Sequence, residues 1–197
     1  GTPSLVLMER AGVGVTDVVV QHCGDLLGAG ASVLILLGPG NNGGDGRVVA
    51  RLLHSRGCTV QVVACQASHY SEDFLVQLKL YTEKCGSDGL FVFGEAREFV
   101  GGVCGAALAV EDFQQLVTNA VISIDSLLGT GSKLPLRGGV ADLLQAWLEV
   151  PKLERHVRVA IDIPSGIDAD SGQVGDLAFT ADVTATIQLP KRGMLQY

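Results

Sequence analysis

The segment Gly40-Asn41-Asn42-Gly43-Gly44-Asp45-Gly46 constrains the fold of this chain more than any other. It has four glycines in seven residues and lies between an apolar run at 33–37 and a helix-like apolar pattern at 48–53. This order predicts a buried strand, a glycine-rich turn and a helix. Because glycine tolerates positive φ and close approach to the backbone, we expect this turn to contact a ligand, with phosphate suited to the helix N-terminus behind it.

The spacing of these glycines excludes two common nucleotide-binding motifs. It is not the G-x-G-x-x-G pattern of dinucleotide-binding folds, and no Gly-Lys-Ser/Thr follows as in a P-loop. The alternative interpretation is a strand-to-helix turn that needs glycine only for its geometry.

Composition indicates a globular domain and argues against several classes of partner. With 197 residues, 47% of them hydrophobic, the chain suits a single domain over 1–197. Its net charge of −7, its low aromatic content and the absence of a Lys/Arg run argue against nucleic-acid binding. We also expect no membrane association, because no apolar stretch reaches the length of a membrane span.

The cysteines point to a reduced environment. There are five, an odd number, and none forms a C-x-x-C pair, which fits neither a disulfide framework nor a zinc site. We therefore expect free, mostly buried thiols and an intracellular protein, cytoplasmic or mitochondrial.

Apolar strands alternate with helical patterns along the chain, which is typical of an α/β fold with a mostly parallel central sheet covered on both faces. We expect strands at residues 32–37, 59–64, 120–124, 157–161 and 182–187, and helices at residues 4–23, 44–56, 71–85, 111–119 and 140–150. Residues 86–110 are either an irregular connection or a short edge strand.

Polar segments follow three of the expected strands, namely residues 41–46, 125–131 and 162–168. The carboxyl ends of parallel strands meet at one edge of a sheet, so we expect these segments to converge on a ligand or ion. Asp125 and Asp162 should lie close together, where like charges raise one pKa or recruit a cation. Asn, Asp and Ser oxygens suit a hard cation rather than zinc. The alternative is that each Asp only caps the following turn or helix.

These motifs together resemble the YjeF N-terminal domain family, the NAD(P)H-hydrate epimerases. The matching segments span nearly the whole chain in the expected order: residues 3–12, 38–46, Asp125 with 129–131, 162–166, 181–184 and 190–193. The resemblance implies a Rossmann-like three-layer α/β/α sandwich. It also implies interconversion of the R and S forms of hydrated NADH and NADPH (NADHX and NADPHX), and partnership with an ATP- or ADP-dependent dehydratase.

The resemblance also implies roles for individual residues. A potassium ion would be held by Asn42, Asp125 and Ser165. Asp162 is the first candidate for proton transfer, and Asp45 is the second. The substrate would be bound by Asn41, Asn42, Gly43, Gly44, Asp45, Gly129, Thr130, Gly131, Ser132, Lys133, Leu134, Pro135 and Asp162.

One departure concerns the loop after Gly129, where some family members carry an acidic residue. Residues 132–137 contain none, so no role of such a residue transfers to this chain. Lys133 or Arg137 either meets a substrate phosphate or is a solvated loop charge.

Other functions stay open at this stage. Some domains of this fold are non-catalytic scaffolds or binding modules that dimerise in mRNA decapping, although those tend to lose the Asn-Asn-Gly-Gly-Asp pattern that is intact here. A secreted, lipoprotein-associated role is another alternative, and a nicotinamide-dependent dehydrogenase is weaker because its fingerprint is missing. The resemblance is compatible with a homodimer and with a domain excised from a longer epimerase–dehydratase chain.

Overall fold

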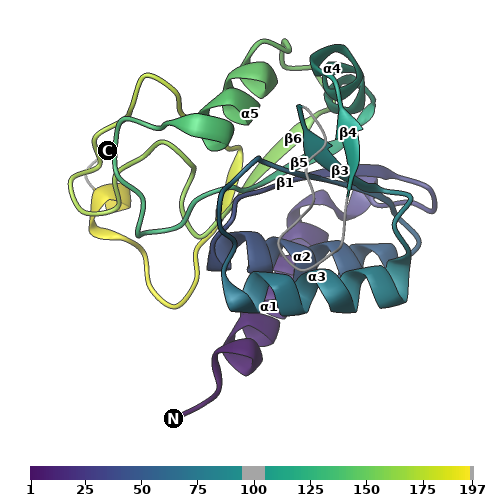
Figure 1. Ribbon diagram of the computed structural model, residues 1–197, viewed down its shortest axis with the longest axis horizontal. Coiled ribbons are helices and arrows are strands. Elements are labelled where there is room, and N and C mark those ends of the chain that lie inside the picture. The colour runs from purple at the N-terminus through teal and green to yellow at the C-terminus, as the bar shows by residue number, and fades with distance from the viewer. Residues whose placement is uncertain (95–104, 196–197) are drawn as a thin grey trace.

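The computed structural model describes residues 1–94 and 105–195, which form a sheet with helices on both faces (Figure 1). The helices are α1 (Ser4–Cys23), α2 (Asn41–His54), α3 (Glu72–Cys85), α4 (Val110–Asn119) and α5 (Gly138–Leu148), with short 3-10 turns at Gly24–Leu26 and Arg192–Leu195. The strands are β1 (Ser32–Leu37), β2 (Thr59–Ala64), β3 (Leu90–Phe93), β4 (Ala106–Leu108), β5 (Ile122–Ser126), β6 (Val157–Ile161) and β7 (Val183–Ala185).

The strand order explains where a ligand can bind. The seven strands pair in parallel in the order β4-β3-β2-β1-β5-β6-β7. The chain builds outward from β1 to β4 on one side and then returns to build β5 to β7 on the other. In open α/β sheets, ligands bind beyond the carboxyl ends of the strands at such a reversal. Here the reversal lies between β1 and β5.

The alternating side chains of β1 divide the core into two layers. Val33, Ile35 and Leu37 pack with buried residues of α1, α2 and α3, whereas Leu34 and Leu36 pack with buried residues of α4 and α5. Figure 1 shows α1, α2 and α3 on one face and α4 and α5 on the other. The prediction of a three-layer α/β/α sandwich with a parallel sheet is confirmed.

Most element boundaries agree with the sequence patterns. The helix at 4–23 and the strands at 32–37, 59–64 and 157–161 are confirmed. The Ser71 side chain caps α3 by accepting a hydrogen bond of 3.2 Å from the Phe74 backbone N–H. Within the described residues, no helix combines the length and the apolar character needed to cross a membrane.

The prediction of a glycine-rich turn at residues 41–46 is wrong. The whole segment is the beginning of α2, which starts at Asn41 rather than at residue 44. The glycines at 40, 43, 44 and 46 do not have positive φ. The chain turns from β1 into α2 through residues 38–40 instead. Glycine is needed in the first turns of α2 because the surrounding backbone and side chains come too close for a Cβ atom.

Residues 86–110 contain two strands, where the sequence indicated at most one. β3 pairs with both β2 and β4, so it is an interior strand, and β4 forms the edge of the sheet. β4 has only three residues and β3 four, too few for a clear apolar pattern. Residues 95–104, including Cys104, lie outside the described residues.

Candidate functional site

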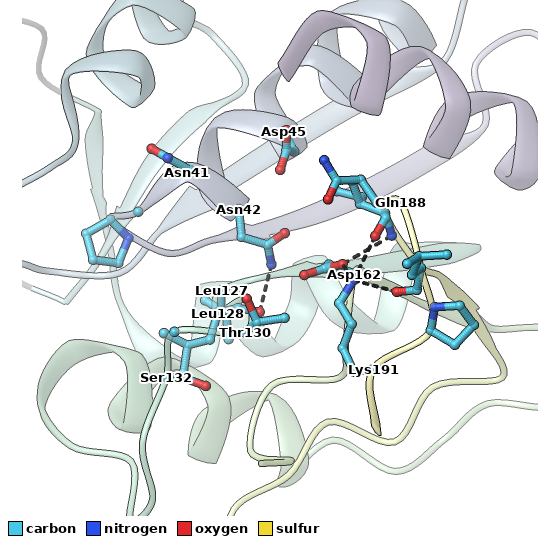
Figure 2. Close-up of a pocket in the computed structure, with 17 residues that line it drawn as sticks. Asn41, Asn42, Asp45, Leu127, Leu128, Thr130, Ser132, Asp162, Gln188 and Lys191 are labelled. Atoms are coloured by element: carbon cyan, nitrogen blue, oxygen red, sulfur yellow. Dashed lines mark hydrogen bonds and ion pairs between the residues drawn. The ribbon is translucent and has the colours of Figure 1, made fainter. Parts of the chain in front are cut away.

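A cavity of about 820 Å³ opens at the carboxyl ends of β1, β5, β6 and β7. All three polar segments expected from the sequence reach it, as does a fourth segment after β7. The residues that line the cavity are 39–42, Asp45, 127–132, Asp162 and 187–191 (Figure 2).

The glycines in the first turns of α2 pack so closely against neighbouring backbone and side chains that a Cβ atom does not fit at their positions. A Cβ atom at Gly43 would overlap the carbonyl oxygen of Gly38, and one at Gly46 would overlap the Ser126 side chain. Ser126 also donates a hydrogen bond from Oγ to the backbone carbonyl of Asn42. These contacts hold Asn41, Asn42 and Asp45 at the edge of the cavity.

Asn42 joins the ends of two neighbouring strands. Its Nδ2 donates to the carbonyl of Leu128 at 2.8 Å and to the carbonyl of Ile161 at 3.4 Å. Its Oδ1 is buried and has no hydrogen-bond partner among the described residues. Because buried polar atoms are nearly always partnered, this oxygen indicates the place of a missing donor or cation.

Asp125 is a fully buried carboxylate in the middle of the sheet, paired in register with Leu36 of β1 and Ala160 of β6. Its Oδ1 accepts from Leu127 N at 3.0 Å and from Ser165 Oγ at 2.8 Å, and its Oδ2 accepts from Ser165 N at 2.7 Å. Burial raises the pKa of Asp125 to about 6, although these hydrogen bonds oppose the shift.

The residues around Asp125 fit a hard cation. Among the described residues no lysine or arginine forms an ion pair with Asp125, so its buried charge has only neutral donors. Ser165 Oγ, which also accepts from Leu128 N at 3.0 Å, and the unpartnered Asn42 Oδ1 add neutral oxygens. The described residues hold no cluster of three His, Cys, Asp or Glu that could bind a metal. The oxygens of Asp125, Ser165 and Asn42 suit a cation that accepts carbonyl and hydroxyl ligands.

Asp45 and Asp162 are the two carboxyl groups that line the cavity. Burial raises the pKa of Asp45 to about 7, and the charge of nearby Asp162 adds to the shift. Asp162 follows β6 in a left-handed conformation with φ of 70°, which is uncommon outside glycine. Its backbone N–H donates to Ala185 O at 2.9 Å, and its Oδ1 accepts from Ile187 N at 3.1 Å.

The segment after β7 supplies site residues that the sequence patterns did not identify. Lys191 forms an ion pair with Asp162 and donates to the carbonyls of Ile187 at 2.8 Å and Leu189 at 3.0 Å. Gln188, with φ of 64°, is the other non-glycine residue of the described chain with positive φ, and it also lines the cavity. The segment at 190–193 carried part of the family resemblance, but nothing in its composition indicated a role.

The predicted substrate residues separate into two groups. Those that line the cavity are Asn41, Asn42, Asp45, Gly129, Thr130, Gly131, Ser132 and Asp162. Gly43 and Gly44 pack behind it, and Lys133, Leu134 and Pro135 are not among its lining residues. Arg137 does not line it either, so a phosphate contact by Lys133 or Arg137 gains no support. Of the predicted potassium ligands, Ser165 is hydrogen-bonded to Asp125, and Leu128 links Asn42 to Ser165 by accepting from Asn42 Nδ2 and donating to Ser165 Oγ.

A second cavity of about 420 Å³ adjoins the first and shares Asn41, Asp45, Ile187 and Gln188 with it. Its other lining residues come from α1 and the start of α3, with Arg10 and Asp73 as the charged side chains. A ligand longer than the first cavity can therefore extend past Asp45 toward α1.

Comparison with known proteins places the chain among relatives with the same overall organisation. The family model described as "YjeF-related protein N-terminus" matches residues 4–193. The chain is 36% identical to a Rhodopirellula baltica protein named NAD(P)H-hydrate epimerase, over 97% of this chain and 68% of that protein. It is also 36% identical to a Lentilactobacillus buchneri protein of the same name, over 100% of this chain and 78% of that protein.

Two further similarities concern the longer relatives and the fold. A Moorella thermoacetica protein named bifunctional NAD(P)H-hydrate repair enzyme Nnr is 34% identical over 98% of this chain, which spans only 33% of that protein. The crystal structure of yeast ynu0 superposes with a TM-score of 0.72 at 24% identity, covering 98% of this chain and 74% of the yeast chain. The similarity to ynu0 supports the fold, and the family match covers nearly the whole sequence. This chain therefore belongs to the family of YjeF-related protein N-terminal domains.

Proposed function

We propose that this chain is an NAD(P)H-hydrate epimerase, which interconverts the R and S forms of NADHX and NADPHX. The observation that carries the proposal is the pair Asp45 and Asp162 in one cavity at the sheet edge. Two carboxyl groups in different environments provide one proton donor and one carboxylate. Support also comes from the relatives at 36% identity, which are named for this activity.

The cavity has the features that a nucleotide substrate requires. The beginning of α2 lines it through Gly40 and Asn41, and Gly40 makes no side-chain cap, so N–H groups of the first turn are available to phosphate. The loop of residues 129–132 also lines it. The adjoining cavity beside Asp45 gives room for the rest of a dinucleotide.

The chemistry needs a group that assists the loss and return of water at one carbon. In the hydrated nicotinamide ring, the hydroxyl-bearing carbon is bonded to the ring nitrogen. Asp45 donates a proton to the hydroxyl, the C–O bond breaks, and the nitrogen lone pair forms a C=N bond as water leaves. Water then adds to the other face of the ring and returns a proton to Asp45. Nothing is oxidised or reduced, and the substrate atoms are conserved.

Asp162 supports this reaction as a carboxylate. The intermediate ring carries a positive charge, and a fixed negative group close to it lowers the energy of the transition state. The sequence favoured Asp162 over Asp45 for proton transfer. The geometry favours the reverse, because Asp162 forms an ion pair with Lys191 whereas the pKa of Asp45 is raised to about 7. A donor with a pKa near the working pH is the most effective.

We further propose that Asn42, Asp125 and Ser165 hold a potassium ion. The buried Asp125 carboxylate and the unpartnered Asn42 Oδ1 support this assignment. The ion would supply a positive charge to balance the buried Asp125 carboxylate. A dehydratase that uses ATP or ADP would consume the S form that the epimerase supplies.

The proposal is tested by timing the epimerisation of purified R-NADHX in potassium buffer against the spontaneous rate, with R and S forms separated by chromatography. We expect acceleration by the parent protein, loss of most of it in Asp45→Asn, and full activity in the surface control Asp112→Asn on α4. A folded parent protein that gives no acceleration would contradict the proposal and favour a non-catalytic binding module.

A further inference from the structure

Lys191 occupies an unusual place in the cavity wall. It lies in the segment after β7, its side chain is only 13% exposed, and its ammonium group forms an ion pair with Asp162 Oδ1. The approach of Lys191 to Asp162 is visible in Figure 2. A lysine in a cavity that takes a phosphate-bearing substrate has two candidate roles, contact with the phosphate or support of a catalytic group.

The hydrogen bonds of Lys191 decide between these roles. An ammonium group has three N–H donors. Lys191 Nζ already has four acceptors within reach: Asp162 Oδ1, Ile187 O at 2.8 Å, Leu189 O at 3.0 Å and Thr186 Oγ at 3.3 Å. It therefore has no donor left for a substrate phosphate unless it breaks one of these bonds.

The two carboxyl oxygens of Asp162 differ in their hydrogen bonds. Oδ1 is held by Lys191 and by the Ile187 N–H. Oδ2 has no hydrogen bond with a described residue and lies 3.7 Å from the position that a Cβ atom of Gly129 would occupy. Since Gly129 and Asp162 both line the cavity, Oδ2 faces the space where the substrate would bind.

Resting on the proposed function, we infer that Lys191 is a positioning residue that holds the Asp162 side chain with Oδ2 turned toward the substrate. It acts through Asp162 and makes no direct contact with the substrate. Lys191 also donates to the backbone carbonyls of Ile187 and Leu189, so it ties Asp162 to the segment after β7 that lines the cavity.

The test is a double-mutant cycle in the epimerase assay with Lys191→Met, Asp162→Asn and the combined variant. We expect Lys191→Met to lower kcat about 100-fold, the usual cost of a misplaced catalytic group, and to change KM less than about twofold. Because Lys191 acts through Asp162, the combined variant should be no slower than Asp162→Asn alone. Lys191→Arg, which keeps the charge, should recover part of the lost rate.

Two further variants separate positioning from a general loss of structure. Lys152 forms an ion pair with Asp182, which lies at the amino end of β7, whereas the cavity lies at the carboxyl ends of the strands. Lys152→Met should therefore keep parental kcat. If Lys191→Met does not fold, Lys191→Gln replaces it, because its amide retains donors for the backbone carbonyls but lacks the charge. Melting temperature and circular dichroism establish folding for each variant.

Three results would overturn the inference. The first is a combined variant that is slower than Asp162→Asn by the full factor of the lysine change. The second is a KM increase of tenfold or more with kcat unchanged, which would make Lys191 a substrate-binding residue. The third is parental activity in folded Lys191→Met. An inactive parent protein would instead overturn the proposed function, and this inference with it.

Discussion

Asp45 on α2 and Asp162 after β6 line one cavity, and the charge of Asp162 adds to the burial that raises the pKa of Asp45 to about 7. Asp45 lies on the helix that follows β1, and Asp162 directly follows β6, so the relation between the two groups depends on the parallel order of β1, β5 and β6. The site thus has one carboxyl group, that of Asp45, which holds a proton near neutral pH, and a second, that of Asp162, which forms an ion pair with Lys191.

Activity should depend on the protonation of Asp45. With a pKa of about 7, Asp45 carries its proton below that pH and loses it above. We expect kcat to fall up to tenfold per pH unit above about pH 7 once the spontaneous rate is subtracted. Asp45→Asn should remove this dependence together with most of the rate. A pH profile that is flat from 6 to 9 in the parent protein would exclude Asp45 as the donor.

The same group should affect stability, with a definite sign. The pKa of Asp45 is about 7 in the folded chain against 3.8 for an ordinary aspartate, so the folded state binds the proton more tightly. Stability therefore falls as pH rises from about 4 to about 7 and stays reduced above. Asp45→Asn should raise the melting temperature relative to the parent at pH 8 and much less at pH 4. An equal difference at both pH values would show that folding does not raise the pKa of Asp45.

Potassium should stabilise the folded protein if Asn42, Asp125 and Ser165 bind it. A ligand that binds only the folded state at 100 times its Kd adds about 2.7 kcal/mol to the free energy of unfolding. We expect the melting temperature to rise in potassium chloride compared with choline chloride at equal ionic strength. In Asp125→Asn, which keeps the side-chain shape, this rise should disappear. An undiminished potassium response in the variant would place the ion elsewhere.

The glycines of α2 should be required for folding rather than for flexibility. A Cβ atom at Gly43 would overlap the backbone oxygen of Gly38, so Gly43→Ala should lower the free energy of unfolding by roughly 3 kcal/mol or prevent folding. Gly14 in α1 is the matched control, since a Cβ atom there has no neighbour within 4 Å. Gly14→Ala should stabilise the protein by about 1 kcal/mol. Urea unfolding of both variants measures the difference, and equal effects would contradict the packing argument.

Arg47 should be a source of instability. Its side chain is fully buried on α2, its three nitrogens have no hydrogen-bond partner in the described part of the chain, and burial lowers its pKa to about 9. Its guanidinium carbon lies 4.5 Å from the centre of the Phe74 ring, which offsets only part of the desolvation cost. Arg47→Met should raise the free energy of unfolding by roughly 1–3 kcal/mol, as seen when apolar residues replace buried charges.

Arg51, one turn further along α2, is the control for that change. Its side chain forms an ion pair of 2.5 Å with Glu9 of α1. Arg51→Met removes this contact and leaves Glu9 with only the Gln77 amide as a donor, so it should lower stability or leave it unchanged. If Arg47→Met is the more destabilising of the two in thermal unfolding, Arg47 has a stabilising contact beyond Phe74.

The sequence predicted the fold and the position of the site because both depend on patterns along the chain. Apolar strands alternate with helices, and polar residues follow three strands, so a parallel sheet must bring Asn42, Asp125 and Asp162 to one edge. The structure confirms that arrangement. Lys191 could not be found in this way, because its role depends on the path of the chain after β7 and not on any local pattern.

The helical conformation of the glycine-rich segment could not be predicted from the sequence either. Four glycines in seven residues are equally compatible with a turn of positive φ and with a helix packed tightly against its neighbours. The two are distinguished by the close approach of Gly38 to Gly43 and of Ser126 to Gly46. Ser126 is distant from Gly46 in the chain, so its approach cannot be read from a local pattern.

The packing of α2 separates the glycines of the signature from its polar residues. Gly43 and Gly46 are required by the close approach of Gly38 and Ser126, and they would be required in a copy of this domain that had lost all catalysis. Asp45 faces the cavity and would be free to change there. Across related chains, an intact glycine framework thus records common architecture, whereas activity is recorded by the side chains placed between the glycines.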